Sequence, residues 1–139
     1  MSGFTRGRIN SYQKTSIQTA SKEELILMLY NGAIRFTHQA IDHIDKKEFP
    51  DGAKNICRAQ AIVVELMNAL NFDQGGDIAK NLEYLYSVMV DNLTTANFDR
   101  VVEPLRVNLE ILDRLKSAWE GVLQQIKEGK IQATPSQLR

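Results

Sequence analysis

The chain has 139 residues, in which 17 lysines and arginines balance 17 aspartates and glutamates. This length fits one domain with a real core, and the balanced charge gives no overall field to attract nucleic acid or an anionic membrane. The single cysteine, Cys57, excludes an internal disulfide and a multi-cysteine metal site. The first residues lack the apolar core of a secretion signal, and no run approaches the roughly 18 apolar residues of a membrane span. The sequence therefore predicts a soluble, cytoplasmic protein without membrane insertion.

Residues 1–20 show no helical period, and the stretch from Tyr12 to Ala20 is polar apart from two isolated apolar anchors, Tyr12 and Ile17. We expect them to form an extended N-terminal arm. The first helix is predicted to follow at about 22–44, because Ser21 and Glu24 have the spacing of a capping box. In that motif each side chain accepts a hydrogen bond from the other residue's free backbone N–H group.

Three more amphipathic helices are predicted along the chain, at about 50–70, at about 77–96, and from near Val102 to near Gly129. Pro50 and Pro104 suit first helical turns, and the segment Asn71–Gly76 is read as a turn that ends the second helix. The core stripe expected for the third helix is Ile78, Leu82, Leu85, Tyr86, Met89 and Leu93. Four such helices with short connections predict an all-α, antiparallel up-and-down four-helix bundle over 21–129, followed by a disordered tail at 130–139.

Each predicted helix carries more apolar side chains than one core-facing stripe requires. The surplus residues are Tyr30, Ile34 and Ile41 on the first helix, Ile62 and Ala69 on the second, Tyr84 and Val88 on the third, and Val107, Ile111 and Val122 on the fourth. One interpretation is that they are ordinary exposed side chains or helix flanks packed on a neighbour. The other is a groove that binds an apolar peptide or helix, covered in part by Tyr12 and Ile17 when the partner is absent.

A search for catalytic or metal-binding residues finds no convincing constellation. His38 and His43 are five residues apart and do not share a helical face, and His38 with Asp42 offers two ligands at most. Cys57 lies near the edge of its stripe and is expected to be a half-buried structural thiol. The pair Gly75-Gly76 lacks the spacing of a phosphate-binding loop. We therefore predict no enzyme activity and no cofactor.

Three blocks of the sequence resemble the flagellar secretion chaperone FliS family. The first is Tyr12-Gln13-x-Thr15 with Gln18-Thr19-Ala20-Ser21-x-Glu23-Glu24-Leu25-Ile26-Leu27-Met28-Leu29-Tyr30-x-Gly32-Ala33. The second is Gly75-Gly76-Asp77-Ile78-Ala79-x-Asn81-Leu82-x-x-Leu85-Tyr86, and the third consists of the pairs Ala96-Asn97 and Ala118-Trp119. The resemblance covers roughly residues 10–122. Three positions depart from the family pattern, namely Lys22, Asn31 and Val88, and the last of these affects the shape of a partner groove.

The resemblance implies a helical bundle that binds the C-terminal segment of newly made flagellin in the bacterial cytoplasm and keeps it from assembling early. It also implies delivery to the flagellar type III export apparatus, including the cytoplasmic domain of the export gate protein FlhA, and it implies no nucleotide or metal. An adaptor for a different secretion client remains the alternative, and the sequence leaves open whether the chain forms homodimers. From helical phase, the expected client contacts are Ile62, Leu66, Tyr84, Val88, Val107 and Ile111, with Tyr12 and Ile17 on the arm.

Overall fold

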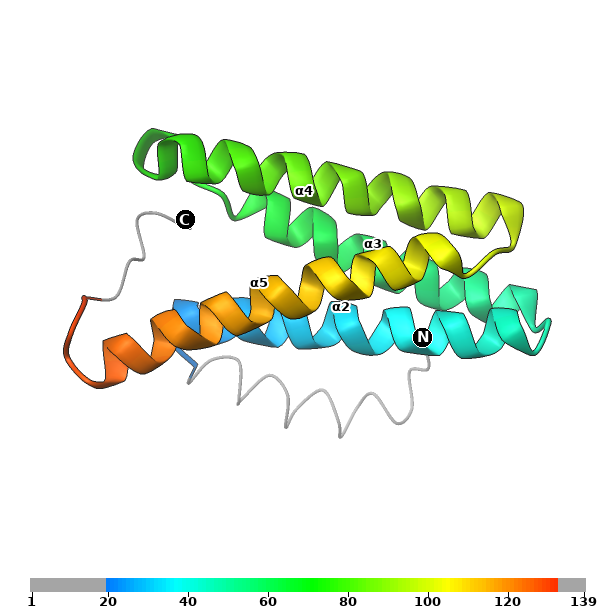
Figure 1. Cartoon of the computed structure of the whole chain (residues 1–139), viewed down its shortest axis with the longest axis horizontal. Coiled ribbons are helices and arrows are strands. Elements are labelled where there is room, and N and C mark those ends of the chain that lie inside the picture. Colours follow the sequence, from blue (N-terminus) through cyan, green and yellow to red (C-terminus); the bar gives the residue numbers. More distant parts are fainter. Residues whose placement is uncertain (1–19, 133–139) are drawn as a thin grey trace.

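The computed structural model describes residues 20–132 of the chain. This part contains four helices: α2 (Lys22–Asp45), α3 (Phe49–Asn68), α4 (Phe72–Asp99) and α5 (Glu103–Lys127). It contains no strand. Successive helices run in opposite directions (Figure 1), and α2 and α4 each pack against both α3 and α5. The all-α antiparallel up-and-down bundle expected from the sequence is therefore confirmed.

The helix ends follow from local chemistry. The predicted capping box of α2 is present, because the Ser21 backbone N–H donates to Glu24 Oε1 at 3.0 Å and the Glu24 N–H donates to Ser21 Oγ at 3.1 Å. At the start of α3, Pro50 lies in the first turn, where its missing N–H group has no helical partner to lose. Arg100 ends α4 in the left-handed conformation, with a φ of 58°.

The turn expected over Asn71–Gly76 was wrong, because α4 begins at Phe72 rather than near Asp77. Asn71 caps this early turn by accepting a hydrogen bond from the Gln74 N–H at 3.2 Å. Gly76 then interrupts the regular helix with a φ of 53° and a ψ of −127°, a conformation that favours glycine. The paired glycines therefore produce a kink inside α4 instead of a loop before it.

The core runs between the four helices and is built mostly from aliphatic side chains. The largest fully buried ones are Ile56, Val63, Leu66, Met89, Leu93, Leu105 and Leu112. Gly32 of α2 allows α3 to approach closely, since a Cβ atom at this position would lie 2.9 Å from Ile62 Cδ1. Within the described residues, none of the helices has the length and apolar character needed to cross a membrane.

The predicted N-terminal arm, apart from Ala20, lies outside the described residues, as does the tail from residue 133 onward. One smaller expectation was wrong: Cys57 is exposed rather than half-buried. Its position on α3 faces solvent because the buried residues of that helix, Ile56, Ala59 and Val63, follow a helical period that leaves Cys57 outside the stripe.

Candidate binding face between α4 and α5

A buried asparagine joins α4 and α5 where the two helices are close. Asn108 of α5 accepts a hydrogen bond from Asn92 Nδ2 at 2.9 Å and donates from its own Nδ2 to the Met89 carbonyl oxygen at 3.0 Å. These bonds identify the flank of α4 that faces α5. One and two turns closer to the start of α4, the same flank carries Val88 and Leu85.

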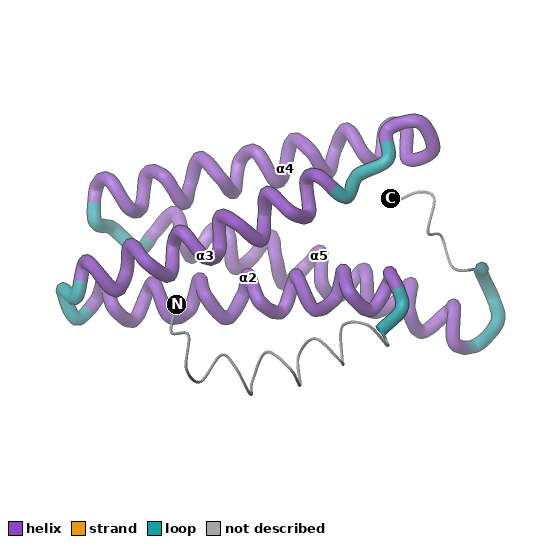
Figure 2. Tube along the Cα trace, turned by 180° about the vertical axis from the view of Figure 1, so that it is seen from behind, coloured by secondary structure: helices purple, strands orange, loops and turns teal. Residues whose placement is uncertain are grey.

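Beyond this contact the two helices diverge. In Figures 1 and 2, α4 and α5 meet near the turn that connects them, whereas the start of α4 and the end of α5, at the other end of the bundle, lie far apart on its upper and lower sides. The far half of α5 stays with α2, because Trp119 Nε1 donates to the Glu23 carbonyl oxygen at 2.7 Å. The first half of α4 is thus left without α5 beside it.

The apolar stripe of α4 continues into this uncovered half. Met89 and Leu93 are completely or almost completely buried, but Leu85 and Leu82 are only half-buried, and Ile78 is 71% exposed. The expectation that Ile78 lies in the core was therefore wrong. Ile78 lies on the side of α4 that the periodicity predicts, but none of the described helices packs against that side of α4 at the position of Ile78.

The flank of α5 that faces α4 carries a matching row of apolar side chains. Starting from Asn108, the same phase reaches Ile111, Leu115 and Val122, each of them half-buried. We call the combined surface the open face and define it by Ile78, Leu82, Leu85 and Val88 on α4 with Ile111, Leu115 and Val122 on α5.

A tyrosine pair closes the core at the level of the open face. Tyr30 of α2 and Tyr86 of α4 are both buried, and their hydroxyl oxygens lie 2.7 Å apart. Burial raises the pKa of both hydroxyl groups above the ordinary value, and the neighbouring Tyr30 raises the pKa of Tyr86 further. The bond links two helices that do not otherwise pack side by side, so it spans the middle of the bundle. Tyr30, expected as a surplus residue, is therefore a core residue, and so are Ile41 and Ala69.

Four of the eight expected client contacts lie on the two flanks that face each other. Val88 and Ile111 belong to the open face, Tyr84 stands at its rim with 69% of its surface exposed, and Val107 is an exposed residue of the same α5 flank. Periodicity alone identified these positions, because they are the apolar side chains that a single core stripe leaves over.

The other four expected contacts are not on this face. Leu66 is 2% exposed and belongs to the core, and Ile62 packs toward α2, where its Cδ1 atom lies beside Gly32. In this conformation neither side chain is available on the open face. Tyr12 and Ile17 lie outside the described residues.

The sequence reasoning missed Leu82, Leu85, Leu115 and Ile78 as open-face residues, because it assigned them to the core. Their spacing fits a core stripe, and no local signal separates a stripe that a neighbour covers from one that it leaves uncovered. The signal lies in the divergence of α4 from α5, which is a tertiary property.

Polar side chains also gather at the turn between α2 and α3. The potential ligand atoms of His43, Glu48 and Asp51 all lie within 4.8 Å of one another, and His43 Nδ1 is 2.7 Å from Glu48 Oε1. His43 lies in the last turn of α2, Glu48 is the N-cap residue of α3 and Asp51 lies in its first turn, where the helix dipole favours negative charge. The cluster is therefore explained by a side-chain hydrogen bond across a turn and by acidic residues at a helix start. The sequence analysis considered His43 only together with His38, which is not part of this cluster.

Comparisons with a family model and with individual relatives point to the same protein family. Residues 5–126 match the family model described as flagellar protein FliS. The chain is 33% identical over 121 residues to the flagellar secretion chaperone FliS of Vibrio cholerae, covering 84% of this chain and 89% of that one. It is 29% identical over 114 residues to the FliS of Bacillus subtilis, covering 82% and 84% respectively. It is also 30% identical over 118 residues to the flagellar secretion chaperone FliSB of Pseudomonas aeruginosa, covering 82% and 94%.

The match covers all four helices except the last residue of α5, and it includes every residue of the open face. The resemblance inferred from the three sequence blocks is thereby confirmed, and with it the expectation of a chaperone that serves flagellar export through a client protein. The chain belongs to the FliS family of flagellar secretion chaperones.

Proposed function

We propose that this chaperone binds the C-terminal segment of flagellin on its open face and holds it unpolymerised in the bacterial cytoplasm. The observation that carries the proposal is the apolar stripe of α4, which continues through Leu85 and Leu82 to Ile78 after α5 has turned away. An amphipathic client helix laid along this stripe would take the place that α5 vacates. Helix-in-groove recognition uses such a row of apolar anchors spaced by one helical turn.

Binding of this kind blocks assembly without chemistry. The apolar side chains through which a flagellin segment packs on other subunits would be buried against the open face. A disordered client loses conformational freedom on binding, at a cost of about 2–5 kcal/mol or more. That cost moderates the affinity, which suits a complex that has to be released during export. Delivery to the flagellar type III export apparatus, with FlhA as the receiving gate protein, is part of the same proposal.

The names of the relatives support a secretion chaperone and do not specify the client. A helical adaptor for another secretion client is the second candidate function, because any amphipathic segment of suitable length fits an apolar stripe. The exposed Ile78 would contact flagellin or another amphipathic client equally well, so a binding experiment has to distinguish the two candidate functions.

The test is a calorimetric titration of the full chain with a flagellin C-terminal peptide, followed in parallel by Trp119 fluorescence. We expect Ile78→Asp to raise the dissociation constant at least about tenfold, since a carboxylate would have to be desolvated in the apolar contact. The matched control is Phe98→Asp, which places the same charge on an exposed apolar position at the opposite end of α4. Both variants should keep the wild-type melting temperature within a few degrees.

Two results would contradict the proposal. If wild-type protein does not bind the flagellin peptide at high micromolar concentration but binds another secreted protein, the client is wrong. If the peptide binds and Ile78→Asp affects it no more than Phe98→Asp, the open face is not the site.

A further inference from the structure

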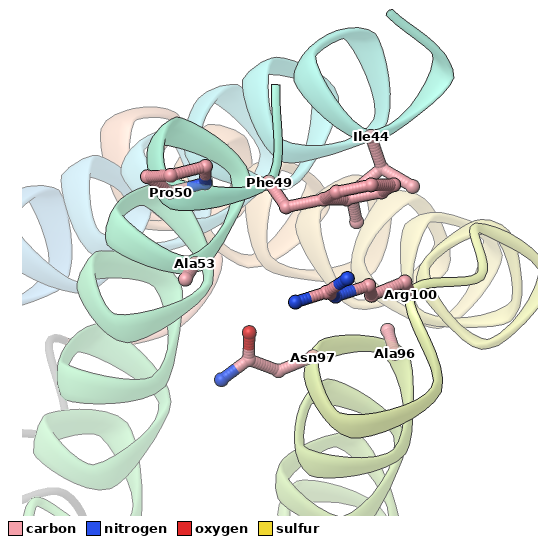
Figure 3. A pocket seen from close by; sticks show the side chains of 7 residues that line it. All are labelled: Ile44, Phe49, Pro50, Ala53, Ala96, Asn97 and Arg100. Carbon is pink, nitrogen blue, oxygen red and sulfur yellow. The ribbon is translucent and has the colours of Figure 1, made fainter. Parts of the chain in front are cut away.

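A pocket lies at the end of the bundle that is opposite to the open face. The end of α2, the first turns of α3 and the end of α4 enclose a pocket of about 230 Å³, many times the roughly 30 Å³ that a water molecule occupies in the liquid. It is lined by Ile44, Phe49, Pro50, Ala53, Ala96, Asn97 and Arg100 (Figure 3). The volume is suited to one side chain of a partner.

The pocket has an apolar wall and a polar edge. Five of its seven lining residues present only carbon atoms from their side chains, and they come from all three helices. The Asn97 amide and the Arg100 guanidinium come from the last turn of α4 and point into the same space (Figure 3). A ligand that fills the pocket would therefore meet apolar surface on one side and hydrogen-bond donors on the other.

Arg100 is held at this edge by the backbone and by an aromatic ring. Its left-handed conformation, with a φ of 58°, ends α4, and its guanidinium carbon lies 4.7 Å from the centre of the Phe49 ring. Among the described residues, no carboxylate lies within ion-pairing distance of this guanidinium, whereas Arg106 contacts both Glu103 and Asp45. A guanidinium that stacks on a ring through its face keeps the N–H groups at its edge free for an anion.

We propose that this pocket binds the C-terminal residue of a partner polypeptide that ends in an apolar side chain. In a chain end, the carboxylate and the side chain share one carbon atom, so both can be satisfied within a single small pocket. The side chain would occupy the space between Ile44, Phe49 and Ala53. The carboxylate would accept hydrogen bonds from the Arg100 guanidinium in the planar, bidentate arrangement that this group favours.

The surface around the pocket suits a polypeptide rather than a small metabolite. Val101, next to Arg100 in the turn between α4 and α5, is 41% exposed. It offers apolar contact to the residues that precede the chain end. This site is separate from the open face, so the proposal does not depend on the identity of the client.

The test is an NMR titration of the ¹⁵N-labelled full chain with N-acetyl-leucine and with N-acetyl-leucinamide, which differ only in the carboxylate. For so small a ligand we expect a dissociation constant on the order of millimolar for the acid. Saturable shifts are expected at the backbone amides of Ala53 and Ala96 and at the side-chain amide of Asn97. The amide ligand should bind at least about tenfold more weakly.

Two arginine variants complete the experiment. Arg100→Met keeps a long side chain over Phe49 but removes the charge, and it should reduce binding of the acid to the level of the amide; Arg100→Gln serves as a second variant. Arg106→Met is the matched control and should bind like wild type. Equal binding of acid and amide, shifts confined to other parts of the bundle, or unchanged binding by both Arg100 variants would overturn the proposal.

Discussion

Tyr30 and Tyr86 show how one hydrogen bond constrains the centre of the bundle. Both side chains are buried, and each hydroxyl group has the other as its hydrogen-bond partner at 2.7 Å. A buried hydroxyl that loses its only partner costs about 1–3 kcal/mol, whereas removal of both groups together costs less than the two separate losses. The pair therefore acts as a unit.

A double-mutant cycle tests this coupling. Tyr30→Phe and Tyr86→Phe should each lower the free energy of unfolding by roughly 1–3 kcal/mol, because each leaves the other hydroxyl buried without a partner. The double variant should be more stable than the sum predicts, with a coupling energy of about 1 kcal/mol, measured by urea denaturation. Tyr84→Phe is the control, since Tyr84 is 69% exposed and should change stability by less than about 0.5 kcal/mol. Strict additivity of the two buried substitutions would contradict the coupling.

Among the elements, α4 contains the backbone conformation that most restricts the sequence. Gly76 has a φ of 53° and a ψ of −127°, and it separates a first turn from the long remainder of the helix. Because α4 is kinked at Gly76, this conformation determines the direction in which the apolar stripe that begins at Ile78 faces. Asn108 then fixes the other half of α4 against α5 with its two hydrogen bonds. The kink and the asparagine contact together determine which part of α4 is covered and which part is open.

Replacement of glycine by alanine should have opposite effects on stability at Gly76 and at Gly121. Gly76→Ala should destabilise the protein by at least about 1–2 kcal/mol, because a Cβ atom is strained at this positive φ. Gly121→Ala should stabilise it by up to about 1 kcal/mol, because Gly121 is in the regular helix α5 and a Cβ there would meet nothing within 4 Å. Thermal unfolding followed by circular dichroism measures both. A stabilising Gly76→Ala would mean that the kink is not a feature of the folded protein in solution.

Over the residues that the structure describes, the molecule is a bundle that is closed at one end and open at the other. At the closed end α4 packs against both α3 and α5, and Met89, Leu93 and Ala96 are almost completely buried. At the open end α5 is held to α2 through Trp119, and the first half of α4 rests on α3 without α5 beside it. Fewer tertiary contacts should make this half of α4 easier to open.

Hydrogen exchange followed by mass spectrometry should show this difference along a single helix. In the free protein, amides in residues 78–86 should exchange at least about tenfold faster than amides in residues 89–96, because they lie in the half that α5 does not cover. Under the proposed function, addition of the flagellin peptide should slow exchange in 78–86 and leave 89–96 unchanged. Equal protection of the two halves in the free protein would contradict the open arrangement.

Periodicity, caps and prolines determined much of this protein from the sequence alone. Ser21 with Glu24, Pro50, Pro104 and the repeating apolar positions were enough to predict four antiparallel helices, since these signals act within one or two turns of the chain. Helical phase also identified Tyr84, Val88, Val107 and Ile111 as residues beyond the core stripe, and local motifs identified the family. Only the tertiary structure decided that Ile78 is exposed, that Tyr30 is buried and that Ile62 packs on Gly32. The physical reason is that helical phase fixes the direction in which a side chain points, whereas its burial depends on whether another helix lies in that direction. In this protein the second half of α5 packs on α2 and not on α4.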